Sequence, residues 1–176
     1  MTMAVRQIVV VPSEILNARA LEIENIDDYV CTLAHDMAET MYEAPGIGLA
    51  ANQVGEALRL IVVDVQYAYA EPKEKKKDPI IIVNPRIAAC EGEDTLEEGC
   101  LSVPEFNVEV SRAQCVEVQG VSLDGQPVRF EAEGLLARVL QHEIDHLEGT
   151  TLLEHASALK RNLYRRRLKK KARREG

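Results

Sequence analysis

The stretch that decides the fold runs from Gly134 to Gly149 and reads GLLARVLQHEIDHLEG. Its apolar side chains recur at helical intervals and give a predicted helix one apolar face, made of Leu135, Leu136, Val139, Leu140 and Leu147. Gly149 stands where a helix commonly ends. We therefore expect this helix, and the polar residues that it carries, to lie partly inside the protein.

Two histidines on this helix, His142 and His146, are four residues apart and therefore share one face. Both imidazoles can reach one cation, and Glu143 projects toward the edge of the same site. There it can accept a proton from a water at the cation without being a ligand. The alternative is an exposed cluster that forms only salt bridges. The chain has only four histidines, so a pair at this spacing around a glutamate favours a metal site.

A catalytic metal site usually has three protein ligands and one open position. Downstream of His146 the candidates for the third ligand are Glu148, Glu154 and His155. Upstream the candidate is Cys100, whose thiolate would complete a Cys-His-His site and offset part of the charge of the cation. The spacing alone leaves both possibilities open.

In the first half of the chain, apolar periodicity predicts a helix over 25–44, ended by Pro45-Gly46. The glycine-rich segment 46–55 has side chains too small for a good core element, and its glycines indicate backbone that another group approaches closely. Strands are predicted at 60–65 and 80–83, with a solvated loop at 67–78 between them and Asn84-Pro85 ending the second.

In the second half, residues 91–98 carry five acids, so we expect this segment to lie mostly at the surface. Apolar and polar side chains alternate at 113–121 and 128–132, and Asp124-Gly125 between them predicts a hairpin. A last helix is predicted over 156–172. This order predicts an α+β fold in which antiparallel β-strands pack around the central metal-binding helix, with a C-terminal helix.

A length of 176 residues, 46% apolar and 28% charged, is typical of one globular domain. We expect a single catalytic domain at 1–159 and a basic helical tail at 160–176. No apolar run is long enough for a membrane span or a signal peptide, so we expect a cytoplasmic protein with no membrane or DNA partner. Most of the four cysteines are expected to be small buried hydrophobic residues, with Cys100 the exception.

The tail differs in charge from the rest of the chain. Residues 160–176 carry ten Lys or Arg and one acid, a local charge of +9, and the remainder carries −17, which together give the net charge of −8. One interpretation is a solvated, frayed terminus. The other is a segment that contacts ribosomal RNA through its phosphates, which would weaken with salt.

Three segments resemble the signature motifs of peptide deformylases and follow one another in the family order. They are G-x-GLAA-x-Q at 46–53, EGCLS at 98–102 and QHE-x-DHL-x-G at 141–149. The resemblance covers nearly the whole chain. It implies a metal-dependent hydrolase of protein biosynthesis that co-translationally removes the N-formyl group from the formyl-methionine of newly synthesised polypeptides and releases formate.

The resemblance also implies roles for residues at the metal. Cys100, His142 and His146 would be the ligands, and Glu143 would take a proton from water and deliver it to the leaving amine. The ligand types suit zinc and permit iron or cobalt. The resemblance implies one Fe²⁺ per chain, for which Zn²⁺, Ni²⁺ or Co²⁺ can substitute.

Other residues are implied to contact the formyl-methionyl nascent peptide. The amide of Gln53 and the backbone N–H of Leu101 would stabilise the oxyanion. Ile47 and Gly48 would line the substrate path and pair with an extended peptide, and Val139 would contribute to the methionine pocket. Alternatively, Gln53 only caps local backbone and Val139 is only a core residue.

Two other functions remain to be distinguished. A metallopeptidase would cleave internal peptide bonds and take its third ligand downstream of His146. A non-catalytic protein with a structural metal would need a fourth protein ligand and would not need Glu143. The sequence offers no obvious fourth ligand, and both Glu143 and Gln53 are present, which favours the deformylase interpretation.

Overall fold

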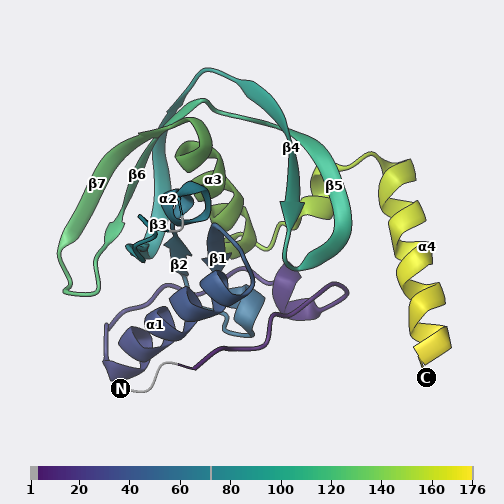
Figure 1. The fold of residues 1–176 in the computed structure, drawn as a ribbon, viewed down its shortest axis with the longest axis horizontal. Coiled ribbons are helices and arrows are strands. Elements are labelled where there is room, and N and C mark those ends of the chain that lie inside the picture. The colour runs from purple at the N-terminus through teal and green to yellow at the C-terminus, as the bar shows by residue number, and fades with distance from the viewer. Residues whose placement is uncertain (1–3, 72, 176) are drawn as a thin grey trace.

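A computed structural model of the chain describes residues 4–71 and 73–175 (Figure 1). Over those residues it has seven strands, four α-helices and three short 3₁₀ helices, at Glu14–Asn17, Ala51–Val54 and Leu152–His155. All strand pairings in the two sheets are antiparallel. The predicted α+β class is confirmed.

The larger sheet has five strands in the order β1-β2-β3-β6-β7. Their bounds are Gly48–Ala50 for β1, Leu60–Val63 for β2, Ile80–Glu91 for β3, Cys115–Val121 for β6 and Pro127–Glu133 for β7. The predicted hairpin at Asp124-Gly125 joins β6 to β7, and Gly125 has a φ of 75°, which suits glycine. A second, two-stranded sheet pairs β4 (Asp94–Cys100) with β5 (Val103–Arg112).

Helix α3 (Gly134–Leu147) lies between the two sheets, at the centre of the molecule (Figure 1). Its apolar side chains form one core cluster with strand residues that include Ile61, Ile82 and Val118. Helix α1 (Asp28–Glu43) packs against β1 and β2 in a second cluster, and the Asp27 side chain caps its start by accepting a hydrogen bond from the Val30 N–H. The helix that carries the two histidines is therefore held in the core by the larger sheet.

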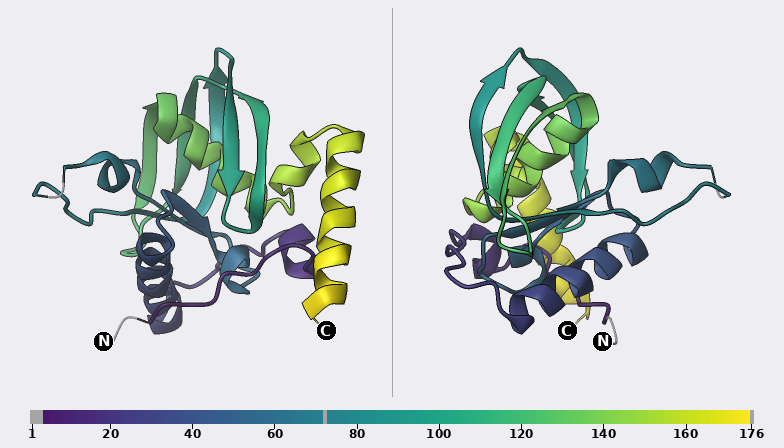
Figure 2. Two further views of the ribbon diagram at one scale, coloured as in Figure 1. Left: turned by 45° about the vertical axis from the view of Figure 1, so that its right-hand side comes forward. Right: turned by 90° about the vertical axis from the view of Figure 1, so that its left-hand side faces the viewer.

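Helix α4 (Ala158–Glu175) packs on β5 through a third cluster, in which the rings of Tyr164 and Phe106 lie 4.8 Å apart. In the left view of Figure 2, α4 stands at one side of the molecule, and the short helix α2 (Val65–Tyr69) lies toward the other. None of the helices in the part of the chain that the structure describes combines the length and apolar character of a membrane span.

Four local expectations were wrong. Residues 48–50, judged too small-sided for the core, form the fully buried strand β1, because larger neighbours fill the space around them. Strand β3 continues past Asn84-Pro85 with a bulge, and Asn84 takes a φ of 50° while its side chain pairs with the backbone of Ile23. Helix α2 begins at Val65, at the end of the predicted strand, and extends into the predicted loop at 67–78. Two cysteines, Cys90 and Cys115, are exposed rather than buried.

Candidate active site around Cys100, His142 and His146

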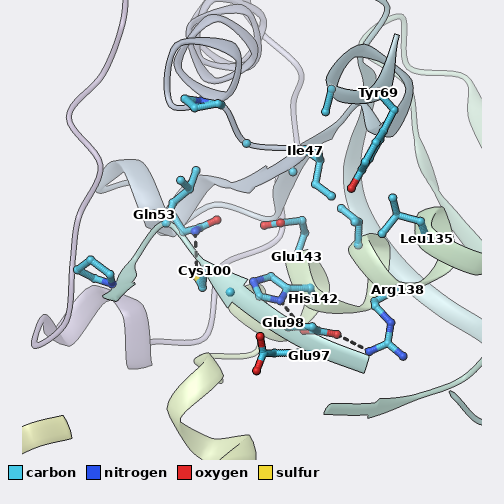
Figure 3. A pocket seen from close by; sticks show the side chains of 18 residues that line it. Ile47, Gln53, Tyr69, Glu97, Glu98, Cys100, Leu135, Arg138, His142 and Glu143 are labelled. Carbon is cyan, nitrogen blue, oxygen red and sulfur yellow. Dashed lines mark hydrogen bonds and ion pairs between the residues drawn. The ribbon is translucent and has the colours of Figure 1, made fainter. Parts of the chain in front are cut away.

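A Cys-His-His cluster joins the end of β4 to the C-terminal half of α3, and Figure 3 shows two of its residues, Cys100 and His142. The potential ligand atoms of Cys100, His142 and His146 all lie within 4.8 Å of one another, and the Cys100 Sγ is 3.2 Å from the His146 Nε2. The two imidazole rings meet edge to face with centroids 5.0 Å apart. One thiol and two imidazoles converging in this way fit a zinc, iron or cobalt ion, so the donor set suits a metal.

The downstream candidates for a third ligand lie elsewhere. Glu148 pairs with Arg59 and Arg19, and Glu154 accepts hydrogen bonds from Thr151. His155 contacts Asp145 through its Nε2 at 3.1 Å. The predicted upstream ligand, Cys100, is the one that the fold brings to the two histidines.

Glu98 contacts one histidine of the cluster and fixes the orientation of its ring. One of its oxygens lies 2.9 Å from the His142 Nδ1, which leaves the Nε2 of that ring to face the cation site. Arg112 contacts both carboxylate oxygens, at 2.6 and 3.0 Å, and Arg138 donates to one of them at 2.7 Å. Burial alone would raise the pKa of Glu98, but the contacts with His142 and Arg112 outweigh it and hold that pKa well below its usual range.

The two histidines differ in their electrostatic surroundings. Burial lowers the pKa of His146 well below its usual value, so its imidazole is neutral and can donate a lone pair. Burial alone would also lower the pKa of His142, but the contacts with Cys100 and Glu98 raise it to about 10. A carboxylate on the far nitrogen makes an imidazole a stronger donor to a metal.

Glu143 is buried beside the cluster and is not among the potential ligands. Its Oε2 has no hydrogen-bond partner among the described residues. Burial raises the pKa of this carboxyl group to about 7. A group with this pKa can both accept and release a proton near neutral pH.

Gln53 turns its amide nitrogen toward the cluster. Its Oε1 accepts a hydrogen bond from the Ala50 N–H at 2.8 Å, so its Nε2 points at the cluster. The Nε2 lies 3.7 Å from the Cys100 Sγ (Figure 3) and 3.2 Å from the Ser102 Oγ. The two sequence interpretations of Gln53 are therefore compatible. Capping the local backbone is what fixes the direction of the donor.

A cavity of about 700 Å³ opens beside the cluster. Ile47, Gly48, Leu101 and Val139, four residues expected at the substrate, line it, and Val139 is also packed in the core. A Cβ on Gly48 would lie 2.4 Å from the Glu143 carboxylate and 2.7 Å from the Val139 side chain. Glycine is required there because the backbone of β1 passes directly over Glu143.

Sequence reasoning missed other residues that line this cavity. Arg138 lies one helical turn before His142, so its position on the same face could have been inferred from the spacing. Leu135 lies two turns before His142 and was assigned only to the apolar face. Tyr69 comes from the segment expected to be a loop, and no local pattern indicated that it would reach the cavity.

This combination of residues matches a known protein family. A family described as polypeptide deformylase matches residues 5–162, which include the cluster, Glu143 and Gln53. The chain belongs to the polypeptide deformylase family. A peptide deformylase of Syntrophobacter fumaroxidans is 48% identical over 169 residues, which cover 96% of each chain.

Solved deformylase structures share the fold. The crystal structure of a peptide deformylase from Legionella pneumophila has a TM-score of 0.86 and 44% identity, and the match covers 98% of each chain. A deformylase from Ehrlichia chaffeensis in complex with actinonin has a TM-score of 0.87 and 40% identity, with 96% of this chain and 98% of that one covered. Deformylases are metal-dependent hydrolases that remove the N-formyl group from the formyl-methionine of newly synthesised polypeptides, and this is the reaction of the chain.

Proposed function

We propose that Cys100, His142 and His146 hold one Fe²⁺ ion in this deformylase and that Glu143 carries the proton of the reaction. The observation that supports this most directly is the buried Glu143 carboxylate, with an unpartnered oxygen, beside three convergent donor atoms. A divalent cation held by these residues would lower the pKa of water and polarise the formyl oxygen. The ligand types also accept Zn²⁺, Ni²⁺ or Co²⁺ in place of iron.

Glu143 then moves one proton through the reaction. Its carboxylate accepts a proton from the attacking water as the water oxygen bonds to the formyl carbon. The carbon–nitrogen bond breaks, and Glu143 returns the proton to the leaving amine nitrogen. The products are formate and a peptide with a free N-terminus, so atoms and charge balance. The raised pKa of the carboxyl group suits both transfers.

Gln53 and Leu101 stabilise the charge that develops on the formyl oxygen. The Gln53 Nε2–H is already oriented before substrate binds, because Ala50 holds the other end of the amide. The Leu101 backbone N–H is the second donor. Ile47 and Gly48 pair with the extended peptide along the edge of β1, and Val139 contacts the methionine side chain.

Formate release from a formyl-Met tripeptide, measured with protein purified without oxygen, tests this function. We expect rapid release, loss of activity when a chelator strips the cation, and recovery when Fe²⁺, Co²⁺ or Zn²⁺ is added back. Metal analysis runs alongside. A fully loaded protein that released no formate would contradict the proposal, and cleavage of internal peptide bonds would favour a peptidase.

The catalytic domain is proposed to span 1–159 and the basic tail 160–176, in a cytoplasmic enzyme that works on nascent chains. Apart from residues such as Tyr164 and Leu168, which pack on the body, α4 is mostly exposed and basic. This helix is proposed to contact ribosomal RNA through its phosphates. Contacts of this kind are sequence-independent and weaken with salt.

Charge reversal on α4 tests the ribosome contact without removing the buried Tyr164. Replacing Arg165, Arg166 and Lys170 with glutamate is expected to reduce co-sedimentation with ribosomes severalfold at low salt. Hydrolysis of a formyl tripeptide should be unchanged. Unaltered co-sedimentation would show that these charges do not carry the contact.

A further inference from the structure

Tyr69 is an unusual component of the active-site cavity. The residue is 73% exposed, yet it lines the same cavity as Cys100 and His142. Figure 3 shows the ring extending from α2 so that its hydroxyl end points toward the space between Ile47 and Leu135. An aromatic ring that lines a pocket offers a ligand a large apolar contact surface.

The turn that carries Tyr69 is fixed in place. The Asp64 Oδ1 accepts hydrogen bonds from the N–H groups of Gln66 and Tyr67, and its Oδ2 accepts from the Tyr42 hydroxyl at 2.7 Å and from the Asp78 N–H at 3.1 Å. One carboxylate therefore caps α2, closes the base of the loop and attaches both to α1. A contact made by Tyr69 costs little ordering of the backbone.

Aromatic and basic side chains hold the other side of the turn. The rings of Tyr67 and Tyr42 lie 4.5 Å apart, and the Lys75 and Lys77 ammonium groups each lie 4.9 Å from one of these rings. Lys77 also pairs with Glu39 on α1 at 2.6 Å. Tyr67 is thus used to anchor the turn, and Tyr69, two residues later, is free to face the cavity.

The cavity wall leads from the metal cluster to Tyr69. Val139 and Leu135 lie three and seven residues before His142 on α3, so they continue the same helix face away from the ligand. A helix rises 1.5 Å per residue, which places Leu135 about 10 Å along the axis from His142. An apolar side chain next to the reacting formyl group would lie along this wall and end at Tyr69.

We infer that Tyr69 covers the outer end of the side-chain pocket and determines how strongly the enzyme prefers methionine to a small first residue. This inference rests on the proposed function. The thioether of methionine makes favourable contacts with aromatic rings, and both groups lose contact with water when they meet. A short side chain such as that of alanine would not extend along the wall to the ring.

The test compares kcat/KM for formyl-Met and formyl-Ala tripeptides. In Tyr69→Ala we expect the preference for methionine to fall about tenfold, with the value for formyl-Ala changed less than twofold. Tyr69→Phe should keep the parent preference, because the ring remains. Tyr29→Ala, which removes an exposed tyrosine of α1 that does not line the cavity, is the matched control.

The outcomes are distinct. An unchanged preference in Tyr69→Ala, or an equal loss on both substrates, overturns the inference while a parent that releases formate still supports the proposed function. A metal-loaded parent that releases no formate from either peptide overturns the proposed function, and this inference with it. Because Tyr69 is mostly exposed, the alanine variant is expected to fold normally.

Discussion

Glu143→Gln is expected to lower kcat for formate release by about three orders of magnitude while the metal content stays at the parent level. General acid–base catalysis by a positioned side chain commonly contributes about 10²–10⁴ in rate. The amide has nearly the same shape as the carboxyl group but cannot accept and return a proton. Since Glu143 is not among the three residues whose donor atoms converge, the proposed cation site should survive the change.

Steady-state assays with metal analysis of each preparation check this expectation. Glu97→Gln is a suitable control, because Glu97 is an exposed glutamate that lines the same cavity. It should keep most of the parent activity. If Glu143→Gln retained even a tenth of the parent kcat with a full metal site, Glu143 would not be the proton carrier.

Glu98→Gln is expected to lower the free energy of unfolding by about 3–5 kcal/mol, because it leaves the charges of Arg112 and Arg138 buried without their shared carboxylate. Both guanidinium groups are buried, so water cannot replace the missing partner. Asp145 still contacts Arg112 at 2.9 Å and limits part of the loss. The same change replaces the charged acceptor of the His142 Nδ1 with a neutral amide, so we also expect weaker metal binding.

Urea denaturation of parent and variant, with the metal removed from both, isolates the effect on the fold from the effect on the metal. Glu97→Gln again serves as the control, one residue away on the same strand, and should change stability by less than about 0.5 kcal/mol. A loss in Glu98→Gln no larger than in the control would mean that Arg112 and Arg138 find other partners.

Sequence periodicity predicted the helices and strands that bury one face and expose the other. The α3 stripe and the alternation at 113–121 each repeat over several residues, so local spacing reveals them. Composition also placed the acid-rich segment 91–98 correctly, since most of it is exposed. It did not indicate that part of this segment forms β4 or that Glu98 is buried, because Arg112 and Arg138 neutralise Glu98 from elements that are distant in sequence.

The candidate site was predictable to the extent that one helix carries it. His142, Glu143 and His146 follow from helical spacing alone, whereas Cys100 lies 42 residues before His142 and was assigned through the family resemblance. Tyr69 reaches the cavity only because Asp64 and Tyr42 hold a short turn against α1. The sequence of residues 65–69 alone does not indicate the contacts that hold this turn, because they are made by side chains outside it.

The attachment of α4 has a consequence for encounter with substrate. The Tyr164 hydroxyl donates to the Pro104 carbonyl at 2.8 Å, and Pro104 lines the cavity, so α4 is attached directly to the cavity wall. Whatever surface captures α4 thereby sets the orientation of the cavity mouth. A peptide tethered to that surface meets the enzyme at an effective concentration set by tether length rather than by its amount in solution. Weak intrinsic affinity for a free formyl peptide would then be compatible with rapid processing of a tethered one.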